Sequence, residues 1–281
     1  MARSRRTELA AVTLGVLGLA AAAAATTTAP RLVFARHGER VAERGLEALR
    51  AEVAPEAVRV LEPYEAREAG FVAMPFAAVL DAVYGEGWRR EEEILFTCSD
   101  GYQPTVPVQR VLDHRAWLAF ERENQSFTIR KRESGELKTV ELGPFYLVWE
   151  NLLDAKVRQE ADYGWPYQLV GVDLIRTRDR FPGMIPSVDV SSPARAGFRA
   201  FRVHCSKCHK VNGEGGGIGP ELVASASPLA YRDPDYLRAW IEDPARIRPN
   251  TRMPALNPAL PDRARTVDEI LAYLEAMRNG R

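Results

Sequence analysis

The chain carries apolar side chains in two kinds of pattern, and the kinds are distributed unevenly. Apolar residues at helical spacing predict helices at residues 47–53, 75–84 and 108–120. Short apolar runs bounded by turn formers predict buried strands at residues 94–98, 145–149 and 167–175. This mixture of elements favours an α+β domain over residues 30–182.

The last third of the chain shows helical patterns only. Helices are predicted at residues 194–204 and 267–277, the second with five apolar side chains at helical spacing: Ile270, Leu271, Tyr273, Leu274 and Met277. Residues 183–193 are rich in proline, serine and other turn formers. We therefore predict two domains, 30–182 and 194–281, joined by a linker at 183–193.

The first 29 residues have the organisation of a secretory signal peptide. Basic residues at positions 3, 5 and 6 precede an apolar run from Leu9 to Ala25, and small residues follow it. Cleavage would release the chain into the periplasm. The alternative is an uncleaved membrane anchor, although the run falls short of the ~20 apolar residues of a spanning helix.

Composition adds few constraints. The 38 basic and 38 acidic residues balance to a net charge of +0, which gives no global preference for nucleic acid or a membrane surface. With 46% hydrophobic residues, the chain can fill two domain cores.

The segment Cys205-Ser206-Lys207-Cys208-His209 has the C-x-x-C-H spacing of a covalent haem attachment site. Its thiols can form thioethers with the haem vinyl groups, and His209 can then ligate the iron. A thioredoxin-like motif would follow a strand, and a structural zinc site would need four ligands. A disulfide between Cys205 and Cys208 would leave His209 unexplained.

A sixth iron ligand is expected downstream, and methionine sulfur is a common one. Met253 lies in a turn-like, proline-rich loop, which could hold its sulfur rigidly. Met277 lies on the apolar face of the last predicted helix, so we assign it to core packing. We therefore predict His209 and Met253 as the axial pair.

Residues 194–281 resemble a class I monohaem cytochrome c. The resemblance covers a first helix with Gly197 and Phe198, the C-S-K-C-H site, a glycine-rich loop ending in Gly-Pro, an Arg-Met-Pro segment and a closing helix. It implies an all-α domain with one covalent haem c. It also implies that the Pro220 carbonyl accepts a hydrogen bond from His209, and that Phe198 packs against Tyr273.

Residues 72–175 resemble the molybdopterin-binding domain of the sulfite-oxidase-like family. The resemblance rests on Asp100-Gly101-Tyr102, the segment Gly143 to Val148, and Trp165 with the strand that follows. Metal-containing members have a cysteine ligand upstream, whereas residues 31–74 contain none. We expect the fold without molybdenum, so no molybdopterin cofactor is predicted.

Three other features have alternative interpretations. Cys98 is expected to be a buried apolar residue, with a redox or metal-binding thiol near His114 as the alternative. The segment Leu32 to Glu39 resembles the start of the histidine phosphatase family, but a second histidine and further arginines would have to converge there. We interpret His37 as exposed or structural.

Charged groups also surround the C-S-K-C-H segment. His204 is expected at the surface, because adjacent helical positions point about 100° apart. Five basic residues around the motif either steer an acidic redox partner or form a solvated helix face: Arg195, Arg199, Arg202, Lys207 and Lys210.

Two functions are consistent with this sequence. The first is a periplasmic electron-transfer protein, whose α+β domain binds a partner or scaffolds a complex. The second is an oxidoreductase in which the N-terminal domain binds a molybdopterin-type cofactor, oxidises a small substrate and passes electrons to the haem. The missing upstream cysteine favours the first, with an unidentified redox protein as donor or acceptor.

Overall fold

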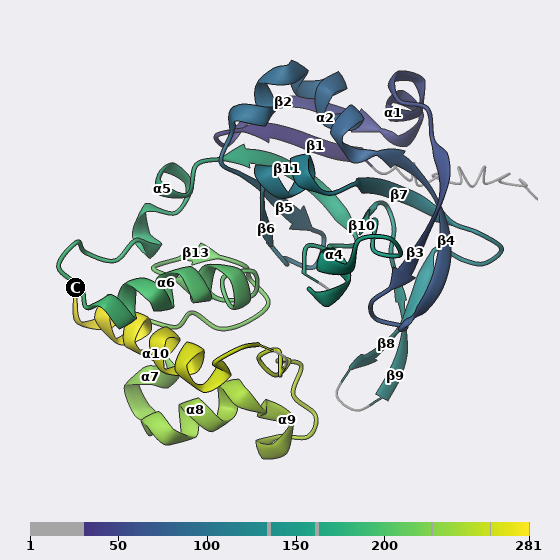
Figure 1. Cartoon of the computed structure of the whole chain (residues 1–281). Helices are drawn as coiled ribbons and strands as arrows, with labels where there is room; N and C mark the ends of the chain where they lie inside the picture. Colours follow the sequence, from purple (N-terminus) through teal and green to yellow (C-terminus); the bar gives the residue numbers. More distant parts are fainter. Residues whose placement is uncertain (1–30, 134–135, 161–162, 226, 259, 281) are drawn as a thin grey trace, which may run out of the picture.

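The computed structural model describes residues 31–133, 136–160, 163–225, 227–258 and 260–280. The predicted signal peptide, residues 1–29, lies outside these ranges. Within them, no helix combines the length and apolarity needed to span a bilayer. The chain forms a mixed α/β N-terminal part and a helical C-terminal part that lie against each other (Figure 1).

Two sheets build the N-terminal part. The first has the order β2-β1-β11-β5-β6, in which only the β1–β11 pair is parallel. Its strands are β1 (Arg31–Arg36), β2 (Glu39–Gly45), β5 (Glu93–Cys98), β6 (Thr105–Pro107) and β11 (Leu169–Ile175). The second sheet has the order β10-β7-β4-β3 and is antiparallel throughout. Its strands are β3 (Glu56–Glu62), β4 (Arg67–Pro75), β7 (Ala116–Arg122) and β10 (Tyr146–Trp149).

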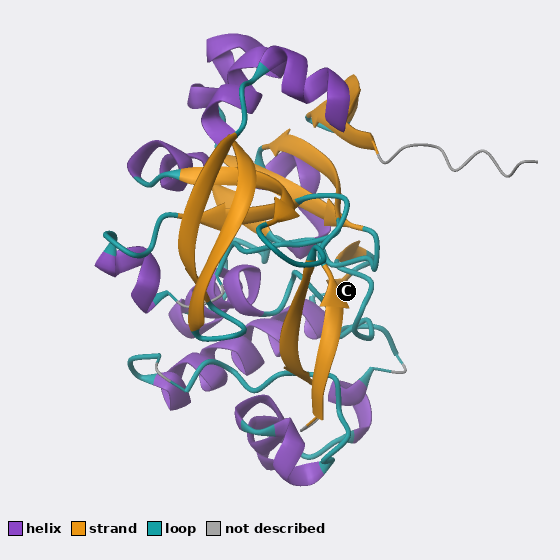
Figure 2. Ribbon diagram, turned by 90° about the vertical axis from the view of Figure 1, so that its right-hand side faces the viewer, coloured by secondary structure: helices purple, strands orange, loops and turns teal. Residues whose placement is uncertain are grey.

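Helices and a hairpin complete this part. The helical segments are α1 (Leu46–Glu52), α2 (Phe76–Tyr84), the 3-10 helix η1 (Gly85–Arg90), α3 (Val108–Asp113) and α4 (Ala155–Gln159). Strands β8 (Thr128–Glu133) and β9 (Glu136–Glu141) form a hairpin that projects from the sheets (Figure 1). Figure 2 shows the helices and strands of the chain from a second side. The expected α+β class is confirmed at the level of mixed helices and sheets; the sulfite-oxidase-like fold stays a prediction.

The predicted helix at residues 108–120 is wrong in its second half. Helix α3 ends at Asp113, His114 is extended, and β7 begins at Ala116. Strand β7 lies between β10 and β4, where Trp117, Leu118 and Ala119 are buried. Packing between two neighbouring strands outweighs the local helical spacing of the apolar side chains here.

The C-terminal part is built on two long helices, α6 (Ser192–His204) and α10 (Arg263–Asn279), which pack together (Figure 1). Their close approach depends on Gly197, because a Cβ at that position would lie 1.8 Å from the carbonyl oxygen of Glu269. The remaining elements are short: α5 (Thr177–Arg180), η2 (Pro182–Met184), β12 (Lys210–Val211), β13 (Glu214–Gly215), α7 (Pro228–Tyr231), α8 (Pro234–Glu242) and α9 (Pro244–Ile247).

The segment expected to be a linker contributes to the C-terminal core. Met184 is fully buried, and its carbonyl accepts a hydrogen bond from the Tyr273 hydroxyl at 2.6 Å. Phe181 packs in the same apolar cluster, together with Leu95 and Ile175 of the first sheet. The core of the C-terminal part therefore continues onto the N-terminal part.

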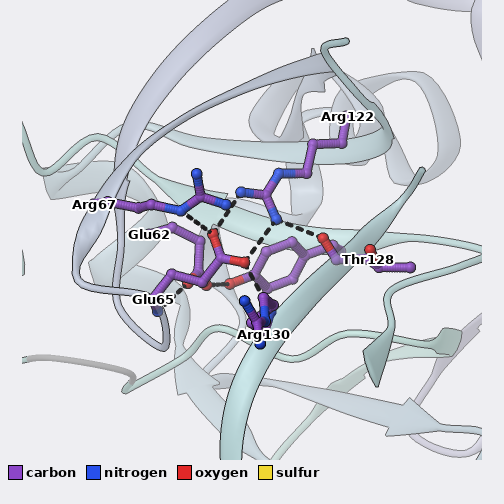
Figure 3. Close-up of polar contacts among 7 residues, drawn as sticks. Glu62, Glu65, Arg67, Arg122, Thr128 and Arg130 are labelled. Carbon is purple, nitrogen blue, oxygen red and sulfur yellow. Dashed lines mark hydrogen bonds and ion pairs between the residues drawn. The ribbon is translucent and has the colours of Figure 1, made fainter. Parts of the chain in front are cut away.

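A cluster of charged residues that is mostly buried joins β3, β4 and β7, and no sequence motif marks it (Figure 3). Glu65 accepts hydrogen bonds from Arg122 Nη2 at 2.6 Å, from Arg67 Nε at 2.9 Å and from the Arg130 N–H. Burial opposes ionisation of Glu65, but these donors outweigh it and lower its pKa to about 2. Glu62 is fully buried beside it, and burial raises its pKa although the Tyr146 hydroxyl donates to it at 2.8 Å.

Candidate haem site

The C-x-x-C-H segment forms a tight turn at the end of α6. The N–H groups of Cys208 and His209 both donate to the Cys205 carbonyl, at 3.0 and 2.9 Å. The cysteines of the chain are free thiols. Burial raises the pKa of Cys205 to about 12 and also raises that of Cys208. Both thiols therefore lie in an apolar setting.

His209 is oriented by its hydrogen bond to the glycine-rich loop. Its Nδ1 lies 2.9 Å from the Pro220 carbonyl, so Nδ1 carries the proton and Nε2 keeps the lone pair that a metal needs. Burial lowers the pKa of His209, although the Pro220 carbonyl opposes this. The contact implied by the resemblance is therefore present.

The glycine-rich loop follows the motif closely, and only some of its glycines are sterically required. A Cβ on Gly219 would lie 2.4 Å from the His209 Cε1, and one on Gly216 would lie 2.0 Å from the Lys207 carbonyl oxygen. Gly213 and Gly215 have φ of 80° and 116°, the left-handed region that favours glycine. Gly217 has open space around it.

Met253 lies in a loop held by its own hydrogen bonds. Its N–H donates to the Thr251 hydroxyl at 3.2 Å, and the Trp240 indole N–H donates to its sulfur at 3.0 Å. Tyr236 stacks on Trp240, with ring centroids 6.2 Å apart. Iron ligation by Met253 stays a prediction. Met277 packs against the apolar core, as predicted.

A comparison with protein families agrees with this geometry. The family model described as Cytochrome c matches residues 194–277. The C-terminal part of the chain is a cytochrome c domain. The family match supports haem c as the cofactor and electron transfer as the activity. A search of the curated proteins finds no match to the chain.

The residues of this domain fit a covalently attached haem. Two thiols and an imidazole share one turn, and His209 presents Nε2 because Nδ1 is hydrogen bonded. Gly219 lies against the imidazole ring where it lacks a side chain, and the Cβ of any other residue at this position would displace the ligand. Phe198 packs on Tyr273 with ring centroids 5.5 Å apart, so the expected contact between the first and last helices is confirmed.

The α+β part covers one side of the haem attachment turn. The Gln103 N–H donates to the Lys207 carbonyl at 2.9 Å, and the Gly217 N–H donates to the Gly101 carbonyl at 3.1 Å. Gly101 and Gln103 belong to the loop between β5 and β6. The Asp100-Gly101-Tyr102 segment, which carries part of the molybdopterin-domain resemblance, therefore lies directly beside the cytochrome c motif.

Arg202 is not part of a basic surface around the motif, unlike one of the two interpretations given above. Its side chain is 8% exposed, forms an ion pair with Glu93 of β5, and lies over the Phe181 ring at 4.6 Å. It joins the two parts of the chain and does not face solvent. Lys207, between the two cysteines, is also held against the β5–β6 loop through its carbonyl.

Structural roles are found for the remaining candidate residues. Cys98 is 4% exposed at the end of β5, and burial raises its pKa, as expected for an apolar residue. His37 has φ 54° in the turn between β1 and β2, and its Nε2 lies 3.3 Å from Glu91. His114 pairs instead with Asp154, so the two histidines have separate partners.

His204 differs from its expected surface position. It is half-buried, and burial together with the neighbouring Lys207 lowers its pKa to about 4. The contacts of Trp240 and Gly219 at this site are not predicted by any sequence pattern. The spacing between Trp240 and Met253 carries no recognisable signal, and the role of Gly219 depends on a contact with His209 across the loop.

Proposed function

We propose that this chain is an exported electron-transfer protein that carries one covalently bound haem c and exchanges electrons with a redox protein. The observation that carries the proposal is the His209–Pro220 hydrogen bond beside two free thiols in a cytochrome c domain. Bound haem would supply an iron that cycles between Fe(II) and Fe(III).

The chain contributes attachment, orientation and exclusion of water. Cys205 and Cys208 would hold the macrocycle as thioethers, and His209 would ligate the iron through Nε2. Pro220 fixes the imidazole ring and raises its basicity, because its carbonyl accepts the Nδ1 proton. Met253 would supply the sixth ligand, with its loop constrained by the hydrogen bonds to Thr251 and from Trp240.

The α+β domain acts as a scaffold for the haem domain in this proposal. Leu95 and Ile175 of its first sheet pack in the same cluster as Phe201 of the cytochrome domain. The buried Glu93–Arg202 pair and two backbone hydrogen bonds add polar contacts at the same boundary. A boundary with apolar packing and paired charges favours one fixed arrangement of the domains.

Location in the periplasm rests on the basic and apolar segment before residue 30 and on the chemistry of the site. Thioether attachment of haem to a C-x-x-C-H motif takes place outside the cytosol.

Metal and cofactor analysis of protein matured in a periplasm tests the proposal. We expect one iron and one covalent haem per chain, and a reversible one-electron couple. Molybdenum or copper in stoichiometric amount would support instead the cofactor-dependent oxidoreductase considered from the sequence. Iron without a covalently bound haem would refute the proposal.

A further inference from the structure

The covered side of the haem attachment turn restricts where another protein can approach the haem. The β5–β6 loop lies against Lys207 and Gly217, and the Arg202 side chain is buried in an ion pair with Glu93. A redox partner could not reach the Arg202 side chain or the Lys207 backbone without displacing these contacts. Docking is therefore expected on a face of the cytochrome c domain that the α+β part leaves open.

The segment from Arg246 to Arg252 offers such a face. Arg246, Arg248 and Arg252 are exposed, and none of the three forms an ion pair with another described residue. Ile247, between two of them, is 37% exposed. Figure 1 shows α9 at the end of the cytochrome c domain that is remote from the two sheets.

The other arginines of this region are already engaged. Arg238 pairs with Asp268 and Asp235, and Arg265 pairs with Asp262. Arg263 donates to the carbonyl of Leu256. The three unpaired guanidinium groups therefore concentrate positive charge within seven residues of chain, and uncompensated charges of one sign attract a partner of the opposite sign.

Backbone hydrogen bonds hold the segment in a fixed turn. The Arg248 N–H donates to the Pro244 carbonyl at 2.8 Å, and the Thr251 N–H donates to the Arg248 carbonyl at 3.0 Å. Arg252 is followed directly by Met253, the predicted iron ligand. A protein bound to this turn would lie next to the residue that is predicted to ligate the iron, and a short separation favours electron transfer.

We propose that the Arg246–Arg252 segment is the docking surface for an acidic electron-transfer protein. Carboxylates around the partner's own redox centre would pair with the three guanidinium groups, and its apolar centre would pack on Ile247. Mixed charged and apolar contact of this kind is typical of short-lived redox complexes, which bury little area. The proposal rests on the electron-transfer function proposed above.

Small redox reagents of opposite charge test the surface. Ferrous holoprotein is oxidised in a stopped-flow instrument by hexacyanoferrate(III), which becomes hexacyanoferrate(II), or by the cationic tris(phenanthroline)cobalt(III), which becomes cobalt(II). One electron leaves the haem iron in each case. The test variant carries Arg246→Gln, Arg248→Gln and Arg252→Gln. The control carries Arg90→Gln, Arg115→Gln and Arg178→Gln, three exposed residues that lie on η1, directly before β7, and on α5.

The test variant should react about tenfold more slowly with hexacyanoferrate(III) at low salt, since charge steering changes association rates by about 10–10³-fold. Its rate with the cobalt complex should not fall. The control, with the same net charge, should keep the wild-type rate with both reagents. Poly-L-glutamate should slow hexacyanoferrate oxidation of the wild type and the control, and have less effect on the test variant.

Equal slowing of the test and control variants would overturn the docking surface, because only net charge would then matter. Slowing of the test variant by both reagents would also overturn it. The haem spectrum and reduction potential separate the two proposals. A wild-type reduction potential together with an oxidation rate that does not depend on the three arginines would refute only the docking surface. Absence of a covalent haem or of a reversible couple would refute the proposed function.

Discussion

Alanine at Gly219 is expected to disturb the proximal side of the haem site, and alanine at Gly217 is not. A Cβ on Gly219 would lie 2.4 Å from Cε1 and 2.5 Å from Nδ1 of His209. Carbon atoms in contact are normally about 3.5–4.0 Å apart, so ring and loop must separate by about 1 Å. A Cβ on Gly217 would have no neighbour within 4 Å. Neither glycine has positive φ, so backbone strain does not distinguish the two variants. They differ in the space that is available for the added Cβ.

Two terms set the size of the effect. Overpacking by one carbon costs about 1–3 kcal/mol in a packed site. Displacement of the ring would also stretch the 2.9 Å contact between Nδ1 and Pro220, and a hydrogen bond contributes about 0.5–1.5 kcal/mol. Gly219→Ala should therefore lower the free energy of unfolding by about 1.5–4.5 kcal/mol, the sum of the two terms. Gly217→Ala should change it by less than about 0.5 kcal/mol, as is usual for surface positions.

Denaturant unfolding of both holoproteins, followed by Soret absorbance, measures this difference. The midpoint should fall for Gly219→Ala at an unchanged m-value, and the reduction potential should change with the orientation of His209. Equal midpoints for the two variants would refute the assigned contact between Gly219 and the imidazole.

Three further predictions concern the distal side and the buried charges. Met253→Ala should lower the reduction potential and abolish the weak charge-transfer band at the red end of the spectrum; an unchanged spectrum would exclude Met253 as the ligand. Trp240→Phe removes the N–H donor to the Met253 sulfur, making the sulfur a better donor to Fe(III). The potential should fall by about 20–60 mV in a redox titration, from about 0.5–1.5 kcal/mol per hydrogen bond; a rise would contradict this. The pKa of Glu65 is lowered from 4.5 to about 2, so its contribution to stability is present above pH 4.5 and lost as the pH falls towards 2. Glu65→Gln should flatten acid unfolding in that window and cost about 3–5 kcal/mol at neutral pH, because Arg122 loses its anionic partner; an unchanged acid transition would argue against the pair.

The cytochrome c domain was more predictable than the α+β domain because its signals are local. The C-x-x-C-H spacing and the apolar faces of α6, α8 and α10 can each be recognised within one segment. The contact between His209 and Pro220 followed from the resemblance and is confirmed.

Non-local packing limited the predictions elsewhere. Strand β7 was predicted as helix because its burial depends on two strands that are distant in sequence. Strand β4 was not predicted, because it begins with the charged residues Arg67 and Glu68 and so is not a continuous apolar run. Helical periodicity also cannot show that Arg202 meets Glu93 of another domain, so its part in the domain boundary was missed.

The central claim is that Cys205, Cys208 and His209 hold one covalent haem. Intact mass and the pyridine haemochrome spectrum of periplasmically matured protein test it most directly. We expect one haem that resists acid–acetone extraction, with the spectrum of two saturated thioether bonds. Cys205→Ala should shift the spectrum to that of a single thioether. Complete extraction of the haem from the wild-type chain would contradict covalent attachment.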